Sequence, residues 1–167
     1  MTVLDIVDRK DKILNTKIDP YDFTNNNPEQ ALSIAQNLLD TLRSWKYPGI
    51  AANEVGINAR VICLESDPAY VMFNPMISAT FGDDILLEET DISRRGLVCK
   101  IKRPTGIRVR FQDYNGDTNA MRFTGMTART ILHMCDTLDG LIFYNKASSF
   151  HREKALKKYR KSIRKNK

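Results

Sequence analysis

The sequence is poor in the residues from which metal and disulfide sites are usually built. Only two of its 167 residues are histidine, and only three are cysteine: Cys63, Cys99 and Cys135. Three cysteines without a CxxC spacing exclude a zinc ribbon and a disulfide framework, and they indicate reduced thiols in the cytoplasm. No apolar run approaches the roughly 20 residues of a membrane helix. The early charges of MTVLDIVDRKDK leave no apolar core for a secretory signal, so we predict a protein that is neither secreted nor membrane-bound.

What the sequence does contain fits one globular domain with a basic tail. Hydrophobic residues make up 42% of the chain, which suits a packed core. Residues 151–167 hold nine Lys or Arg and one Glu, a net charge of +8. Because the whole chain carries +6, residues 1–150 carry about −2. We therefore predict a domain over residues 1–147 and a basic segment over residues 148–167.

The basic segment is predicted to form an amphipathic helix with Ser148 or Ser149 as its N-cap. Its expected apolar stripe is Phe150, Leu156, Tyr159 and Ile163. The stripe could dock on the domain and leave the lysines solvated. Alternatively, the helix could contact nucleic acid or an acidic protein surface. The second interpretation assigns partner binding to Lys154, Lys157, Lys158, Arg160, Lys161 and Arg164.

Turn, cap and periodicity signals along the chain indicate an α+β fold. Asn27 and Pro28 form a cap and first-turn pair for a helix that runs to about Lys46. A second helix is expected from near Thr127 to Gly140. Strands are expected over residues 60–65, 70–74, 85–89, 107–113 and 120–123, the last two joined by a turn at Asn115-Gly116.

The stretch ILHMCDTLDG, residues 131–140, looks like a metallohydrolase helix from which catalytic residues have been removed. An HExxH helix places two histidines on one face, where they grip a metal, and a glutamate between them serves as general base. Here His133 is present, but Met134 stands at the glutamate position and Thr137 at the second histidine position.

Three segments in order carry a resemblance to the peptide deformylase family. Residues 131–143 resemble HExDHLxGxLF, PGIAANEV at residues 48–55 resembles GxGxAAxQ, and EETDIS at residues 88–93 resembles EEGCLS. The resemblance extends from about residue 3 to about residue 147. It implies that Glu54 replaces a glutamine that helps to hold an oxyanion, and that Asp91 replaces a metal-binding cysteine. An anion at position 54 would repel a developing oxyanion.

The resemblance implies a fold of antiparallel sheets around a central motif helix, with a helix in the N-terminal half and the basic helix at the C-terminus. It also implies a degenerate active site at Glu54, Asp91, His133, Met134 and Thr137. The remnant pocket is expected to comprise Gly49, Ile50, Ala51, Ala52, Glu54, Asp91, Ile92, His133 and Asp136. We expect no bound metal or other cofactor; an active protein would use iron, zinc or nickel.

The remaining polar side chains have alternative interpretations. Asp136 is expected to form a buried ion pair, with Arg103 as the candidate partner. Asp91 could cap or turn the backbone. We also expect Asp91, His133 and Thr137 to be linked by hydrogen bonds or through water. Asp91, His133 and Asp136 together could also hold a hard metal ion, although Met134 could not relay a proton.

Two classes of function follow. One is a catalytically inactive, deformylase-like binding or structural subunit of a larger assembly. That assembly could be a phage virion tail or baseplate in a bacterial host, or the ribosome contacted through the basic helix. The other is an atypical metal-dependent deformylase or amidase that acts on N-formylmethionyl peptides.

Overall fold

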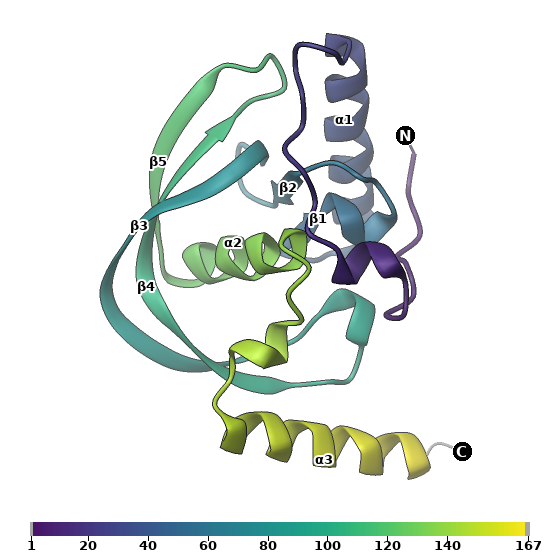
Figure 1. Ribbon diagram of the computed structural model, residues 1–167, viewed down its shortest axis with the longest axis vertical. Helices are drawn as coiled ribbons and strands as arrows, with labels where there is room; N and C mark the ends of the chain where they lie inside the picture. Colours follow the sequence, from purple (N-terminus) through teal and green to yellow (C-terminus); the bar gives the residue numbers. More distant parts are fainter. Residues whose placement is uncertain (1, 166–167) are drawn as a thin grey trace.

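The computed structural model describes residues 2–165. They form one curved sheet with a helix inside its curve and further helices outside it (Figure 1). The three α-helices are α1 (Pro28–Trp45), α2 (Gly125–Leu138) and α3 (Ser149–Lys165). The strands are β1 (Gly49–Ala51), β2 (Val61–Leu64), β3 (Tyr70–Glu89), β4 (Cys99–Gln112) and β5 (Thr118–Thr124). Short 3-10 turns are η1 (Lys12–Asn15), η2 (Ala52–Val55), η3 (Ile92–Arg94) and η4 (Phe143–Lys146).

All five strands pair antiparallel in the order β1-β2-β3-β4-β5. The long strands β3 and β4 bend, and together with β5 they curve around α2 (Figure 1). This arrangement confirms an α+β fold with antiparallel strands around the motif helix, and all the strands belong to a single sheet. The central helix is thereby held between the sheet and the N-terminal part of the chain.

The strand β3 is longer than the sequence predicts. Residues 70–74 and 85–89 are its two ends, and the segment between them stays extended. Register shifts relative to β4 accommodate the intervening turn-forming residues, with Asn74 and Gly82 at φ angles of 51° and 74°. Likewise, β4 begins at Cys99 rather than at residue 107. Pro104 is tolerated because it lies before the part of β4 that pairs with β5.

The helix signals predict their elements well. The Asn27 side chain accepts the Glu29 N–H, and Gln30 completes the capping box, so α1 begins where the cap was expected. At the other end of the domain, Gly140 follows α2 with a φ of 71°. A Cβ at Gly140 would lie 2.8 Å from the backbone carbon of Thr16, so only glycine allows this close approach.

The core explains why α2 occupies the centre. Ile131 and Leu138 are fully buried and Cys135 nearly so, whereas Leu132 is only half-buried. These side chains pack with residues of β2, β4 and β5 in one cluster. A second cluster holds α1 against β1 and β2. The expected burial of the motif helix is therefore confirmed, with Leu132 at its margin.

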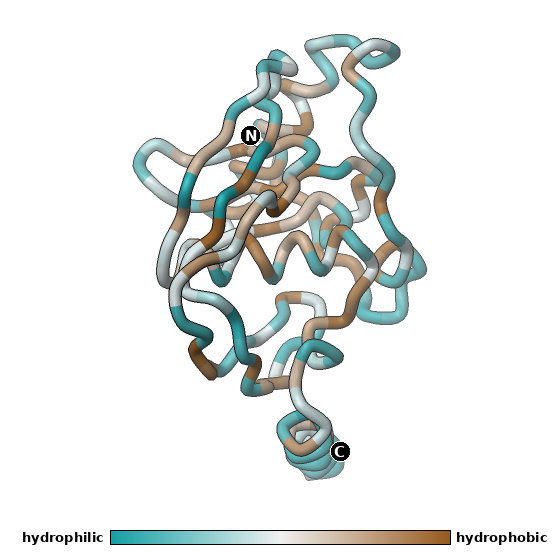
Figure 2. The backbone as a smooth tube through the Cα atoms, turned by 60° about the vertical axis from the view of Figure 1, so that its left-hand side comes forward, coloured by the Kyte–Doolittle hydropathy of each residue, from teal (hydrophilic) through white to brown (hydrophobic). Residues whose placement is uncertain are grey.

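The helix α3 packs on β4 through Ala155, which is 7% exposed, together with the half-buried Leu156 and Tyr159. Phe150 was predicted to join this stripe but is 68% exposed. Six residues separate it from Leu156, which is about one and two-thirds helical turns, so the two side chains lie on different faces. Figure 2 shows the rest of α3 as largely hydrophilic. Among residues 2–165, no helix is long and apolar enough to span a bilayer.

Candidate functional site

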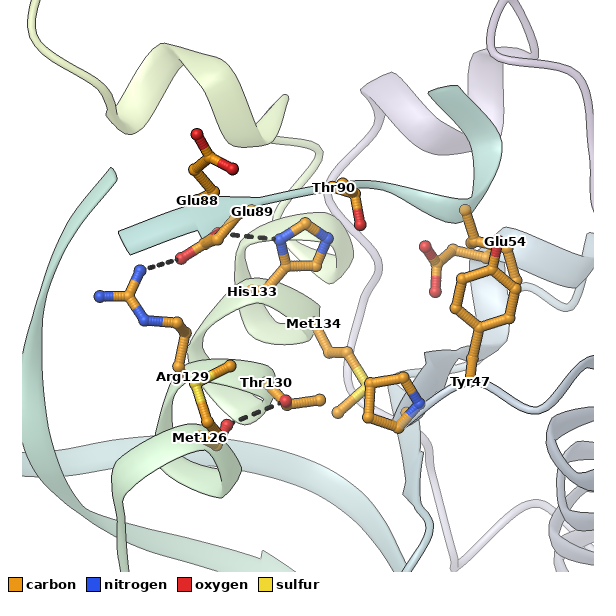
Figure 3. A pocket seen from close by; sticks show the side chains of 13 residues that line it. Tyr47, Glu54, Glu88, Glu89, Thr90, Met126, Arg129, Thr130, His133 and Met134 are labelled. Atoms are coloured by element: carbon orange, nitrogen blue, oxygen red, sulfur yellow. Dashed lines mark hydrogen bonds and ion pairs between the residues drawn. The ribbon is translucent and has the colours of Figure 1, made fainter. Parts of the chain in front are cut away.

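A cavity of about 160 Å³ opens between β1, η2, the end of β3 and α2 (Figure 3). Its lining combines apolar side chains with three glutamates and one histidine. The lining residues are Tyr47, Pro48, Gly49, Glu54, Glu88, Glu89, Thr90, Ile92, Met126, Arg129, Thr130, His133 and Met134.

The helix α2 forms one wall of this cavity through residues that share a face. Met126, Thr130, His133 and Met134 follow the i, i+4, i+7 and i+8 spacing of one helical face. The backbone of β1 approaches this face closely at Gly49. A Cβ there would meet the sulfur of Met134 and a methyl group of Thr130 within 2.8 Å. A side chain at position 49 would therefore force the side chains of Met134 and Thr130 to shift.

A buried carboxylate, Glu89, is the electrostatic centre of the site. Arg103 donates two hydrogen bonds to it, Nε to Oε1 at 2.6 Å and Nη2 to Oε2 at 3.0 Å. Arg129 donates a third, Nη1 to Oε1 at 2.6 Å. Burial alone would raise the pKa of Glu89, but hydrogen bonds from His133 and Arg103 and their charges lower it to about 2. Glu89 is therefore ionised at neutral pH.

The network continues to Asp136 on the sheet-facing side of α2. The Arg103 Nη1 donates to Asp136 at 2.8 Å, which confirms the expected ion pair. Lys146 from η4 adds a second cation at 3.1 Å. Asp136 thus links α2, β4 and η4, and it does not line the cavity.

His133 points its Nδ1 toward Glu89 at 3.2 Å. Because an ionised carboxylate can only accept, this contact places a proton on Nδ1 and leaves Nε2 free of it in the neutral ring. Burial lowers the pKa of His133, but the Glu89 hydrogen bond and the charges of Glu54 and Asp91 outweigh it and raise the pKa. Figure 3 shows the imidazole between Glu89 on one side and Glu54 on the other.

Glu54 is a buried carboxyl group, 3% exposed, and it also lines the cavity. Its Oε2 accepts the Ala51 N–H at 2.8 Å, which fixes the side chain against its own turn. Burial and the nearby charge of Asp91 raise its pKa to about 7, although Ala51, His133 and Arg94 oppose this shift. The cavity therefore contains a carboxyl group that can gain or lose a proton near neutral pH.

Replacing Glu54 with glutamine should stabilise the protein at pH 8 more than at pH 5. The unfolded carboxyl ionises near 4.5, whereas the folded one keeps its proton until about pH 7. Between these two pH values the folded state binds more protons than the unfolded state, so the free energy of unfolding of the parent protein falls as pH rises. Glutamine keeps an oxygen for Ala51 and carries no charge. We expect a gain on the order of 2 kcal/mol at pH 8, measured by urea denaturation.

The matched control is Glu153→Gln, an exposed glutamate on α3 that should leave stability unchanged at both pH values. A Glu54→Gln variant that is less stable than the parent at pH 8 would contradict the argument.

Asp91, which stands at the position of the family's metal-binding cysteine, is held in an ion pair. Asp91 Oδ2 receives the Arg94 Nη1 at 3.0 Å, with both side chains buried. Its Oδ1 accepts the Ser93 N–H at 2.8 Å, so Asp91 caps the turn η3. The capping interpretation is confirmed. Direct hydrogen bonds, one form of the expected link to His133 and Thr137, are not among those that the described chain makes.

The donor set does not fit the metal that the resemblance implies. Thr137 donates its hydroxyl to the His133 carbonyl oxygen at 3.1 Å, as a helix-internal bond. Asp91 is held by Arg94, and Asp136 is turned toward Arg103. Across residues 2–165, no three His, Cys, Asp or Glu side chains are grouped to hold a metal ion. Neither the family positions nor the alternative set of Asp91, His133 and Asp136 forms a ligand cage.

The structure brings together part of the expected pocket. Of its residues, Gly49, Glu54, Ile92 and His133 line the cavity, and Met134 of the degenerate motif lines it as well. The other expected pocket residues lie outside its lining. Ile50 and Ala52 pack in the core beneath α1, and Ala51 packs against α2.

Sequence reasoning missed the two arginines that neutralise the buried carboxylates, Arg94 and Arg129. Arg129 lies one helical turn before His133, so the 3.6-residue period could have placed it beside the same neighbours. Arg94 follows Asp91 by three residues, a spacing that a short turn brings together. Each arginine lies within about one turn of a residue that the motif comparison had identified, Arg94 near Asp91 and Arg129 near His133.

A bent antiparallel sheet wrapped around a motif helix, with a cavity beside that helix, defines the structural class. The family model described as Polypeptide deformylase matches residues 3–153. A peptide deformylase-like protein of Brucella melitensis is 33% identical over 164 residues, covering 96% of this chain and 98% of the relative. A peptide deformylase of Thermodesulfovibrio yellowstonii is 30% identical over 166 residues, covering 96% and 98%.

A solved structure agrees. The Met-Ala-Ser-bound class I type b peptide deformylase of Acinetobacter baumannii superposes with a TM-score of 0.80 at 27% identity. The match covers 87% of this chain and 99% of that chain. The chain belongs to the peptide deformylase family.

Proposed function

We propose that this chain is a member of the peptide deformylase family that does not hydrolyse formyl peptides and instead acts as a binding subunit of a larger assembly. The Asp91–Arg94 ion pair is the observation that carries the proposal. A guanidinium lies 3.0 Å from the side chain that stands in place of the metal-binding cysteine. A divalent cation would have to displace this charge or compete with it.

The chemistry of hydrolysis also lacks its proton acceptor. A positioned general base contributes roughly a factor of 10²–10⁴ to such reactions. Met134 stands at the position of the catalytic glutamate, and a thioether cannot accept a proton from water at neutral pH. The loss of the thiolate, of one imidazole and of the base therefore acts on both metal affinity and water activation.

The proposed binding surface is the basic face of α3. Lys154, Lys157, Lys158, Arg160, Lys161 and Arg164 are all exposed. The helix is fixed to β4 through Ala155, so these cations are presented on a supported element. A phage tail or baseplate protein would bind these cations through an acidic surface, and a ribosome would bind them through its RNA. If RNA is the partner, affinity should fall steeply with salt.

The experiment compares charge-neutralised variants in association assays. Removing the helix would also expose the core under Ala155, so substitutions are preferable to truncation after Ala147. The test variant changes Lys154, Lys157 and Lys158 to Gln, and the control changes the exposed Lys12, Lys17 and Lys102 to Gln. We expect only the test variant to lose its partner. Equal association of both variants would move the binding surface elsewhere.

One observation favours a second candidate, an atypical deformylase or amidase. Glu54, whose pKa is raised to about 7, lies in the same cavity as the His133 imidazole, and the two could exchange protons with a substrate. Tag-free, metal-supplemented protein should be assayed with formyl-Met-Ala-Ser. Turnover above background that is lost in both Glu54→Gln and His133→Ala would support this candidate and reject the inactive one.

A further inference from the structure

A second cavity lies away from the motif helix, between the N-terminal segment, the loop after η3 and α3. Its volume is about 390 Å³, within the usual range for small-molecule sites. Its lining residues are Arg9, Lys10, Asn15, Arg94, Leu97, Ile142, Tyr144, Leu156, Tyr159, Arg160 and Ile163.

The polar part of this lining is cationic. Arg9, Lys10, Arg94 and Arg160 contribute positive charge, and none of the Asp or Glu residues that the structure describes lines the cavity. Among the described residues, Arg9, Lys10 and Arg160 form no ion pair. The neighbouring carboxylate of Asp8 accepts the backbone N–H of Lys10 and stays outside the lining. Three convergent cations without counter-charges, beside an Arg94 that pairs only with Asp91, indicate a site for an anion.

Arg94 is the buried member of this group. Its residue is only 8% exposed, and within the described chain its guanidinium makes one hydrogen bond, from Nη1 to Asp91. A guanidinium carries five N–H donors in a planar fork, so donors remain for a ligand in the cavity that Arg94 lines. Two N–H groups of one fork match two oxygens of a phosphate.

Apolar and aromatic groups form the rest of the lining. Leu97 belongs to the cluster that fixes α3, and Leu156, Tyr144 and Tyr159 pack against it. Arg9 donates from Nη1 to the Tyr159 hydroxyl at 2.9 Å and lies 5.9 Å from the ring centroid, which positions both groups. The site therefore offers an apolar, aromatic wall beside a cluster of phosphate-type donors.

We propose that this cavity binds a nucleoside phosphate, with the phosphate among Arg9, Arg94 and Arg160 and the base against the tyrosine and leucine wall. A phosphate carries up to two negative charges, so it matches several cations better than a ligand with a single carboxylate does. An aromatic wall suits a planar base. The lining shares no residue with the deformylase cavity and only Arg160 with the proposed partner-binding residues of α3, so the inference does not depend on the proposed function.

The test measures binding of AMP, ADP and ATP by calorimetry and by the shift in thermal midpoint. Adenosine and inorganic phosphate serve as partial ligands. We expect the nucleotides to bind at least about tenfold more tightly than either part, because charged hydrogen bonds and base contacts act together. Arg9→Gln and Arg160→Gln should each weaken AMP binding by about tenfold, since each removes a charged donor.

Lys157→Gln is the matched control, because Lys157 is exposed on the same helix and does not line the cavity. It should bind AMP like the parent. Equal loss in Lys157→Gln and Arg160→Gln would show diffuse charge attraction and overturn the site. The proposal also fails if adenosine or inorganic phosphate binds as well as AMP, or if no nucleotide binds at millimolar concentration.

Discussion

Replacing Glu89 with glutamine should lower the free energy of unfolding by about 3–5 kcal/mol, the range seen when one partner of a buried ion pair is removed. The Glu89 side chain is 6% exposed and neutralises Arg103 and Arg129, which are equally buried. Glutamine has nearly the same shape but carries no charge. Arg103 would then keep only Asp136 as an anionic partner, and Arg129 would keep none among the described residues. Urea denaturation at pH 7 measures the loss.

Glu88→Gln is the matched control for this variant, because Glu88 is the exposed neighbour on the same strand. It should change stability by less than about 0.5 kcal/mol. If Glu89→Gln lowered the free energy of unfolding by a similarly small amount, solvent would be able to replace Glu89 as the partner of Arg103 and Arg129, which would contradict the prediction.

The pH dependence gives a second check on Glu89. The pKa of the Glu89 carboxyl is about 2 in the folded protein and near 4.5 in the unfolded chain. A depressed folded pKa contributes stability that is complete above 4.5 and is lost as pH falls toward 2. The difference between the parent protein and Glu89→Gln should therefore shrink over this window, because the parent's own carboxyl becomes neutral.

Local signals predicted the fold where a single residue type decides the backbone. Asn27 and Pro28 fix the start of α1, and the Asn115-Gly116 pair marks the turn between β4 and β5. The continuity of β3 was not predictable in the same way. Asn74-Pro75 and Gly82-Asp83 have the composition of turns, and only pairing with β4 holds them extended through bulges. Tertiary pairing overrode the local signal there.

The candidate site was predictable in its chain positions and in the Arg103–Asp136 ion pair, but not in the partners of Glu89. Motif spacing placed Glu54, His133 and Met134 at one cavity, and the structure agrees. The arginine contacts depend on side-chain direction across strands. Arg103 reaches Glu89 over the β3–β4 ladder, where Ile85 rather than Glu89 is its paired residue. The spacing of residues along the sequence does not predict this diagonal contact between the two strands.

Rebuilding the family's ligand set should restore metal binding only when Arg94 is removed as well. The rebuilt variant carries Asp91→Cys, Met134→Glu, Thr137→His and Arg94→Val. Two imidazoles and a thiolate form a tight zinc site, whereas a guanidinium 3.0 Å from residue 91 would compete with a divalent cation. We expect about one equivalent of zinc to survive dialysis against a chelator, measured by elemental analysis.

The control variant carries the first three substitutions and keeps Arg94. We expect it to lose most of its zinc in the same dialysis, because the Arg94 charge remains beside the new thiolate. A third variant restores the ligands and removes Arg94 but keeps Met134. Relative to this third variant, the complete variant should turn over formyl-Met-Ala-Ser roughly 10²–10⁴-fold faster, since of these two only the complete variant has the base. Equal zinc retention with and without Arg94 would show that the ion pair with Asp91 does not block the metal, and a folded but zinc-free complete variant would show that the backbone around α2 no longer supports the site.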